Sequence, residues 1–318
     1  MNETIILTES LTKRFNCGLL ARRSVEAVKD LTLEVKRGEV FAFLGPNGAG
    51  KTTTINLLMG FLKPSKGKVS VFGLPHGTAE MRKKIGYLSE GYAFYSFFTA
   101  PTLLDYFGKL YGISAQERQK KIEKLMNRLD LWQSRNLAIG RYSRGMRQRL
   151  GIIQALMNDP ELLILDEPTS GFDPQGRKMV RELMLQLKAQ GVTIFLSSHI
   201  LSEVEAICDR VAIINRGELI KQGDLKEIVG AHIGYETRFA NVEAKVIEEL
   251  QSLGLKVEPV GDEFKTFTDD EHLGQRIIDI VRASGGLIKA FVPITRTLED
   301  VFLELTGSNG ADQQQEQQ

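Results

Sequence analysis

The amino-acid sequence predicts an α/β protein with a mixed-sheet core, followed by a smaller α+β domain. Apolar strands are expected at residues 40–44, 85–88, 162–165, 192–196 and 211–214, with helical patterns between them. A glycine-rich loop follows the first of these strands, and two adjacent acidic residues follow the third. Loops that carry function in an α/β sheet lie at the strand ends, so these segments are the first candidates for a site.

The glycine-rich loop has the pattern of a phosphate-binding loop, since residues 44–53 read Leu-Gly-Pro-Asn-Gly-Ala-Gly-Lys-Thr-Thr. Glycines let successive backbone N–H groups turn toward an anion, and the helix expected at residues 54–59 adds its positive end. Lys51 is expected to reach the β- and γ-phosphates, and Thr52 to bind Mg²⁺ through its hydroxyl. The predicted phosphate-loop residues are Gly45, Pro46, Asn47, Gly48, Ala49, Gly50, Lys51, Thr52 and Thr53.

The acidic pair is Asp166 and Glu167, which follows the strand at residues 162–165 and precedes Pro168. Asp166 is suited to hold the water shell of Mg²⁺. Glu167 is suited to polarise a water for in-line attack on the γ-phosphate. An ordinary acidic loop is the alternative, and the phosphate loop in the same chain makes it the weaker one.

Three further segments narrow the class of nucleotide-binding protein. They read Tyr142-Ser143-Arg144-Gly145-Met146, Ser170-Gly171-Phe172-Asp173 and Ser197-Ser198-His199. Together with the two motifs above, they resemble the nucleotide-binding subunit of an ATP-binding-cassette (ABC) transporter over residues 5–228. The first segment is similar to the family signature, and the last to its switch histidine. Arg144, Met146 and Glu90 stand where glycine, glutamine and glutamine are commoner, as in the drug-exporter branch that the daunorubicin-resistance ATPases typify.

The resemblance implies ATP and Mg²⁺ as ligands and a site shared between two ABC ATPase subunits, expected to be identical copies. Ser143 and Gly145 of one chain would cap the ATP held by the phosphate loop of the other, and an α-helix N-terminus there suits an anion. Asp173 is assigned to the same nucleotide site, and Phe15 to the adenine ring.

The resemblance also assigns the catalytic and metal groups. His199 would hydrogen-bond the γ-phosphate while Glu167 serves as the base, so these two are the predicted catalytic residues. Thr52, Asp166 and Glu90 are the predicted metal-side residues. A carboxylate at Glu90 can approach Mg²⁺ or its water, although in its ionised form it cannot donate a hydrogen bond.

Composition limits the partners and the location. The 318 residues carry 41 basic and 40 acidic side chains, a net charge of +1, so no nucleic-acid partner is expected. The sequence lacks a signal-peptide pattern and any apolar run near the roughly 18 residues that span a bilayer. It is therefore expected to be cytoplasmic, and held on the inner face of the cell membrane by the transmembrane permease that the resemblance implies. Cys17 and Cys208 are interpreted as isolated, reduced thiols.

The chain is expected to divide near Gly230. Residues 1–229 would form the ABC ATPase domain, with a helical subdomain at about residues 99–157 and turns at residues 36–39, 66–68 and 215–218. Residues 231–306 read strand, helix, strand, strand, helix, strand and a final helix capped by Thr297. That order predicts a ferredoxin-like plan. Dimer contact, regulation, partner binding and structural support are all open for this domain, and the glutamine-rich residues 307–318 are expected to be disordered.

The leading functional hypothesis is an ATPase that dimerises on ATP and drives a separate permease, exporting drugs, lipids or another amphipathic solute. The alternative is a soluble ABC ATPase that acts on ribosomes or DNA, and a third is a regulatory module that does not hydrolyse ATP. One segment bears on the partner, the aromatic run Tyr92, Phe94, Tyr95, Phe97 and Phe98. It would either lie exposed as a socket for a permease helix or be buried as core, and the sequence leaves both open.

Overall fold

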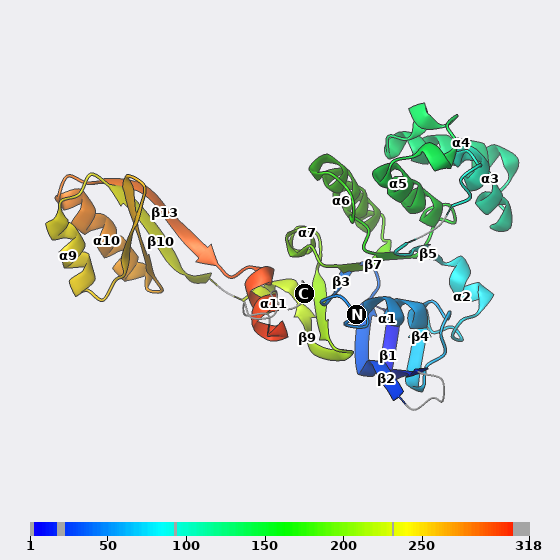
Figure 1. Ribbon diagram of the computed structural model, residues 1–318, viewed down its shortest axis with the longest axis horizontal. Coiled ribbons are helices and arrows are strands. Elements are labelled where there is room, and N and C mark those ends of the chain that lie inside the picture. Colours follow the sequence, from blue (N-terminus) through cyan, green and yellow to red (C-terminus); the bar gives the residue numbers. More distant parts are fainter. Residues whose placement is uncertain (1–2, 18–22, 92–93, 231, 308–318) are drawn as a thin grey trace. The chain divides into compact units, whose positions relative to one another are not determined.

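The computed structural model describes residues 3–17, 23–91, 94–230 and 232–307, and it divides into two compact units (Figure 1). The larger unit comprises Met1–Leu225 and Leu305–Gln318, and the smaller one Lys226–Glu304. The division therefore falls a few residues before the glycine at which the sequence analysis placed the linker. Disorder was predicted for the glutamine-rich residues 307–318, and all of these except Gly307 lie outside the described residues.

A mixed sheet forms the centre of the larger unit. Its strands are β3 (Val40–Leu44), β5 (Ile85–Leu88), β6 (Leu162–Asp166), β7 (Thr193–Ser198), β8 (Arg210–Asn215) and β9 (Glu218–Asp224). They lie in the order β5–β6–β7–β3–β8–β9. All neighbours are parallel except β8 and β9, which form the predicted hairpin with Asn215 opposite Glu218. Parallel strands end at one edge, so the loops after β5, β6, β7 and β3 meet there.

A second, antiparallel sheet covers the phosphate-loop helix. It contains β1 (Thr4–Cys17), β2 (Arg23–Lys36) and β4 (Lys66–Val71), in the order β2–β1–β4. Helix α1 (Lys51–Leu58) contacts β2, β4 and β6. The apolar core joins both sheets and includes Phe41 and Phe43, whose rings pack on Phe195 at centroid distances of 5.8 and 5.6 Å.

The predicted turn at residues 66–68 is wrong, because Lys66 to Lys68 begin β4. Gly67 has a φ of +80°, and a Cβ on it would lie 2.2 Å from the Ser10 carbonyl oxygen. The β1–β4 register shifts at this point, between Glu9 and Thr12. The glycine therefore serves a close approach of two strands at a bulge, and the sequence signal for a turn is the same as for this bulge.

Helices α3 (Ala100–Leu110), α4 (Ala115–Arg128) and α5 (Arg144–Ala155) pack together beside the mixed sheet (Figure 1). Helix α2 (Ala79–Lys83) lies apart from this group and contacts β5, and 3₁₀ turns lie at Trp132–Ser134 and Ile139–Arg141. Side chains of Thr99, Ser114 and Ser143 cap α3, α4 and α5. Two helices that the sequence analysis did not assign follow the strands of the site, α6 (Pro174–Ala189) and α7 (Leu201–Glu205). Within the described residues, no helix is both long enough and apolar enough to cross a bilayer.

The smaller unit confirms the predicted strand–helix order. It contains β10 (His232–Ala240), α9 (Ala244–Ser252), β11 (Val257–Val260), β12 (Glu263–Thr268), α10 (Glu271–Ala283) and β13 (Leu287–Thr295). The antiparallel strand order β11–β12–β10–β13 is that of the ferredoxin-like plan. Its core includes Phe239, Leu250, Ile277 and Val281. Short helices lie before β10 and after β13 in the chain, α8 (Leu225–Val229) and α11 (Leu298–Thr306). Thr297 caps α11 by accepting the Asp300 N–H at 3.2 Å.

Candidate nucleotide-binding and catalytic site

The phosphate loop connects β3 to α1 with a backbone that only glycine adopts easily. Gly48 and Gly50 have φ values of +78° and +107°. Because Gly50 is the left-handed N-cap, α1 begins at Lys51, three residues before the helix start predicted at Thr54. A Cβ on Gly50 would lie 2.3 Å from the Ala27 carbonyl oxygen, and one on Gly45 would lie 2.5 Å from that of Ile214. These glycines are thus required by the packing of the loop on neighbouring backbone as well as by the approach of an anion.

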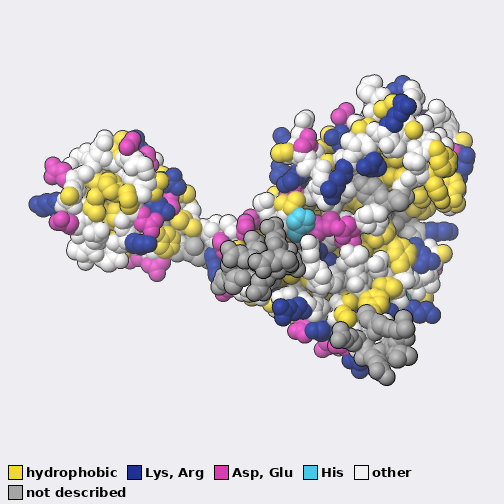
Figure 2. Space-filling view, in the orientation of Figure 1, with side chains coloured by type: hydrophobic (Ala, Val, Ile, Leu, Met, Phe, Trp, Pro, Cys, Tyr) yellow, Lys and Arg dark blue, Asp and Glu magenta, His cyan; other side chains and the backbone are white. Residues whose placement is uncertain are grey.

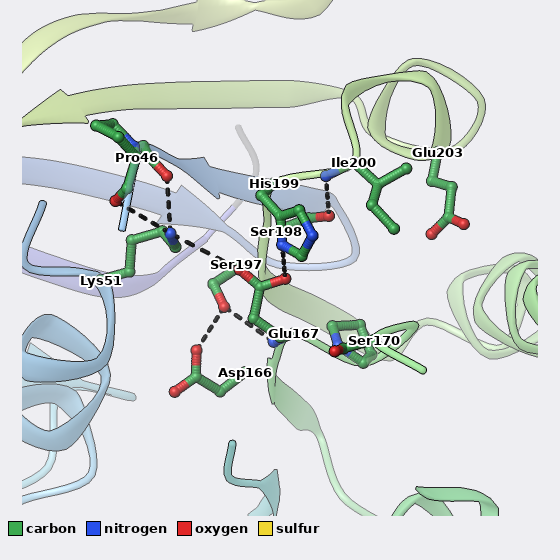
Figure 3. Close-up of polar contacts among 12 residues, drawn as sticks. Pro46, Lys51, Asp166, Glu167, Ser170, Ser197, Ser198, His199, Ile200 and Glu203 are labelled. Carbon is green, nitrogen blue, oxygen red and sulfur yellow. Dashed lines mark hydrogen bonds and ion pairs between the residues drawn. The ribbon is translucent and has the colours of Figure 1, made fainter. Parts of the chain in front are cut away.

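The ammonium of Lys51 lies beside the loop and near the acidic pair. It is buried, and its Nζ donates to the Gly45 carbonyl oxygen at 2.7 Å. The same Nζ lies 3.7 Å from Oε1 of Glu167, as Figure 3 shows. A cation in this position suits the phosphate oxygens that a nucleotide would place in the loop.

Asp166, at the end of β6, is 1% exposed and offers an acceptor atom toward a cation. Its Oδ1 accepts a hydrogen bond from Ser197 Oγ at 2.6 Å, whereas its buried Oδ2 has no hydrogen-bond partner within the described residues. A buried carboxylate oxygen of this kind suits a water molecule of hydrated Mg²⁺. Burial, and after it the charge of Asp166, raises the pKa of the nearby Tyr87 to about 12.

Glu167 is buried and is contacted from two sides. Its Oε2 lies 2.7 Å from Nδ1 of His199, whose side chain is 56% exposed. Its backbone has a φ of +51°. The Glu167 N–H donates to Ser197 Oγ at 3.0 Å, and its carbonyl oxygen accepts from Gln148 Nε2 at 3.3 Å. The carboxylate thus stands between Lys51 and His199 in a backbone that its neighbours hold (Figure 3).

A shallow cavity of about 180 Å³ brings the predicted nucleotide residues together. Its lining consists of Ala27, Pro46, Asn47, Gly48, Gly50, Lys51, Thr52, Thr53, Glu90 and Glu167. Glu90 follows β5 and Glu167 follows β6, which is adjacent to β5 in the sheet, so the strand order places both at the phosphate loop. The cavity therefore offers backbone amides, a lysine, a hydroxyl and two carboxylates, which is the donor set for a nucleotide with a divalent cation.

Apart from Gly45 and Ala49 of the phosphate loop, four predicted nucleotide residues do not line this cavity. Ser143 caps α5 by accepting the Met146 N–H at 3.2 Å, and Asp173 caps α6 by accepting the Gly176 N–H at 2.7 Å. Gly145 packs near Phe172, and Phe15 lies on β1 with Lys13 Nζ 5.2 Å from its ring centroid. Within one chain these residues cap a helix or pack beside neighbouring side chains. Their contacts with a nucleotide stay predictions.

Two further residues of the site were not assigned from the sequence, Ser197 and Gln148. Ser197 bridges the acidic pair, because it donates to Asp166 and accepts from the Glu167 amide. Gln148, on α5, holds the carbonyl oxygens of Glu167 and Pro168. The sequence feature that could have identified Ser197 is its position at the end of an apolar strand. Asp166 ends another apolar strand in the same way.

Comparison with known proteins agrees with this geometry. Residues 28–170 match the family described as ABC transporter. An uncharacterised ABC transporter ATP-binding protein of Nostoc sp. is 39% identical over 302 residues, which are 94% of this chain and 89% of the relative. The Nod factor export ATP-binding protein I of Cupriavidus pinatubonensis is 33% identical over 90% of this chain and 87% of the relative. A solved structure of an ATP-binding subunit of an ABC transporter matches 70% of this chain and 91% of its own, with a TM-score of 0.64 and 30% identity.

Proposed function

The chain belongs to the ABC transporter family, as an ATP-binding ATPase subunit, and from this premise we propose that it powers a separate membrane permease for export. Two cassettes, expected to be identical chains, would close on ATP and separate after hydrolysis. The observation that carries the proposal is the convergence of Lys51, Glu167 and the phosphate loop on one cavity. The export direction is supported by the Nod factor export protein, whose similarity extends over most of both chains.

The side chains of the site divide the chemistry among them. Lys51 and the loop amides stabilise the negative charge of the β- and γ-phosphates. Glu167 accepts the proton of the attacking water while the bond between the γ-phosphorus and the bridging oxygen breaks, giving ADP and phosphate. His199, which contacts Glu167 in this structure, keeps that carboxylate directed at the water.

The metal side of the site consists of the Asp166 carboxylate, with Thr52 and Glu90 at the cavity. These groups would hold Mg²⁺ through its coordinated water, and the nucleotide phosphates would be its further ligands. The ion would then supply positive charge to the γ-phosphoryl group. Ser197 keeps the Asp166 carboxylate in the required rotamer through its 2.6 Å hydrogen bond.

Exposed apolar side chains of the larger unit support a protein partner. Within the aromatic run, Tyr95 and Phe97 are 65% and 72% exposed, whereas Phe94 and Phe98 are half-buried, so the run is exposed in part. Tyr92 lies outside the described residues. A groove in the same unit is lined by Phe61, Tyr87, Leu110 and Tyr111 among others, and Figure 2 shows apolar side chains gathered over α3. We assign this surface to a cytoplasmic segment of the permease, and the chain to the inner face of the membrane.

The soluble alternative has no specific observation in its favour. The relatives described above are ABC transporter ATP-binding proteins, and one of them is an export protein by name. The transporter proposal is therefore the one to test.

The test is to isolate tagged Glu167→Gln protein from detergent-solubilised membranes of its native host, with ATP and Mg²⁺, and to identify the partners by mass spectrometry. A stoichiometric multispanning membrane protein is expected, because blocked hydrolysis should hold the closed, permease-bound state. The matched control is Lys51→Ala in the Glu167→Gln background, which should not be held in that state. Ribosomal or DNA-bound proteins without a membrane partner would contradict the proposal.

A further inference from the structure

The loop that carries Glu167 is attached to α5 at several points. Gln148 Nε2 donates to the Pro168 carbonyl oxygen at 2.9 Å, and Arg144 Nη2 donates to Ser170 Oγ at 3.0 Å. Arg144 and Gln148 are four residues apart and so lie on one face of the helix. On the same side, the Phe172 ring lies 3.6 Å from where a Cβ of Gly145 would be. The segment from Glu167 to Phe172 is therefore fastened to the first turns of α5.

Arg144 is closely fitted to this loop. Its guanidinium lies over Gly171, whose φ is +81°. A Cβ on Gly171 would lie 2.5 Å from Arg144 Nε and 2.8 Å from its Cδ, so a larger residue at this position would displace the arginine side chain. A glycine at position 144, the residue commoner in ABC signatures, would lack both the stem over Gly171 and the donor to Ser170. The attachment at this point thus depends on the arginine of this chain.

We propose that Arg144 is a positioning residue for ATP hydrolysis, which couples the N-terminus of α5 to the loop carrying the Glu167 base. The inference rests on the proposed function, because it takes α5 to close on ATP bound by a second chain. When α5 shifts on closing, the hydrogen bond to Ser170 moves the loop with the helix. Gln148 holds the Glu167 carbonyl oxygen from the same helix, so this motion reaches the backbone of the base. One subunit then adjusts its own base as its signature segment engages the ATP of its partner.

The test measures steady-state ATP hydrolysis of the full chain for Arg144→Ala, Ser170→Ala and the double variant. Each single variant should lower kcat about three- to tenfold with little change in KM, as expected for one hydrogen bond lost on the way to the transition state. The double variant should be no slower than Arg144→Ala, because either change removes the same contact. Arg144→Lys, which keeps the stem and a donor, should recover most of the activity.

Controls separate this role from loss of charge or fold. Lys178→Ala removes an exposed positive charge from the neighbouring α6 without touching the loop contact, and should leave kcat unchanged. Arg144→Ala combined with Glu167→Gln should still dimerise with ATP, since the proposal places the defect in hydrolysis. If Glu167→Gln alone does not dimerise and the wild type does not hydrolyse ATP, the proposed function fails whatever Arg144 does.

Two results would overturn the inference while the proposed function stands. One is a Ser170→Ala variant with wild-type kcat beside a slow Arg144→Ala, which would mean that Arg144 acts elsewhere. The other is an Arg144→Ala variant with a KM raised tenfold and an unchanged kcat, which would make Arg144 a direct ATP contact.

Discussion

Ser197→Ala tests the arrangement of the acidic pair directly. Ser197 is fully buried at the end of β7, and its hydroxyl donates to Asp166 Oδ1 at 2.6 Å while it accepts from the Glu167 N–H at 3.0 Å. Alanine removes one oxygen and little volume, so the cost arises from the two hydrogen bonds. Asp166, whose Oδ2 already has no protein partner within the described residues, would lose its remaining side-chain hydrogen bond.

The expected magnitude follows from those contacts. A hydrogen bond to a charged group contributes about 1.5–3 kcal/mol, and a buried amide left without an acceptor costs about 1–3 kcal/mol. Because both terms share one hydroxyl, we expect a net loss of roughly 2–4 kcal/mol in the free energy of unfolding. The Mg²⁺ concentration for half-maximal ATP hydrolysis should rise about tenfold or more, as for other residues that orient a metal-side ligand.

The assay is a urea titration followed by Trp132 fluorescence, together with a Mg²⁺ titration of the ATPase. Trp132 is the single tryptophan of the sequence and lies in the larger unit, so its signal reports on the unit that contains the site. The matched control is Ser198→Ala, whose buried hydroxyl accepts the Ile200 N–H at 3.0 Å and does not contact the acidic pair. A Ser197→Ala protein within about 0.5 kcal/mol of wild type, with an unchanged Mg²⁺ dependence, would refute the bridging role.

The remaining predictions concern nucleotide binding, the base, sharing in trans and the cysteines. Lys51→Ala should abolish ATP hydrolysis, since it removes the cation at the phosphates; wild-type turnover would remove the phosphate-loop assignment. Glu167→Gln should bind ATP yet remain as an ATP-bound dimer in size-exclusion chromatography, and a variant that stays monomeric while the wild type dimerises would contradict Glu167 as the base. Ser143→Arg should spare ATP binding but block dimer closure. Mixed with Lys51→Ala protein it should regain partial activity, and no recovery would count against a site shared in trans. Burial raises the pKa of the Cys208 thiol, so in a Cys17→Ser variant iodoacetamide should react far more slowly with native than with urea-unfolded protein at pH 8; equal rates would show an accessible thiolate.

The sequence predicted the parts of the site that depend on local motifs. The glycine spacing of the phosphate loop and the acidic pair after an apolar strand each identify their residues without knowledge of the fold, and the cavity contains most of them. The prediction from local sequence was wrong where one residue type occurs in two kinds of backbone structure. Gly67 indicated a turn but occupies a bulge, because a left-handed glycine serves both.

Other parts of the site depend on which strands and helices become neighbours. The hydrogen bond from Ser197 to Asp166 exists because β7 pairs with β6 in parallel, with Asp166 opposite Ser197. The role of Gln148 requires α5 to lie beside the loop after β6. Neither neighbour follows from spacing in the chain, since Ser197 and Gln148 are 31 and 19 residues from the groups they hold.

The left-handed backbone of Glu167 explains how two adjacent carboxylates serve one site. Side chains of consecutive residues in a strand point to opposite faces, so a continued β6 would direct Asp166 and Glu167 away from each other. The φ of +51° at Glu167 ends that alternation. It turns the Glu167 carboxylate toward Lys51 and His199, while Asp166 keeps its hydrogen bond to Ser197 (Figure 3). A non-glycine residue in this region costs about 1–2 kcal/mol, and the contacts of Ser197 and Gln148 with the Glu167 backbone offset that cost. The proposed base is therefore directed by hydrogen bonds to its own main chain, and a change that loosens them should reduce hydrolysis even when the carboxylate itself is intact.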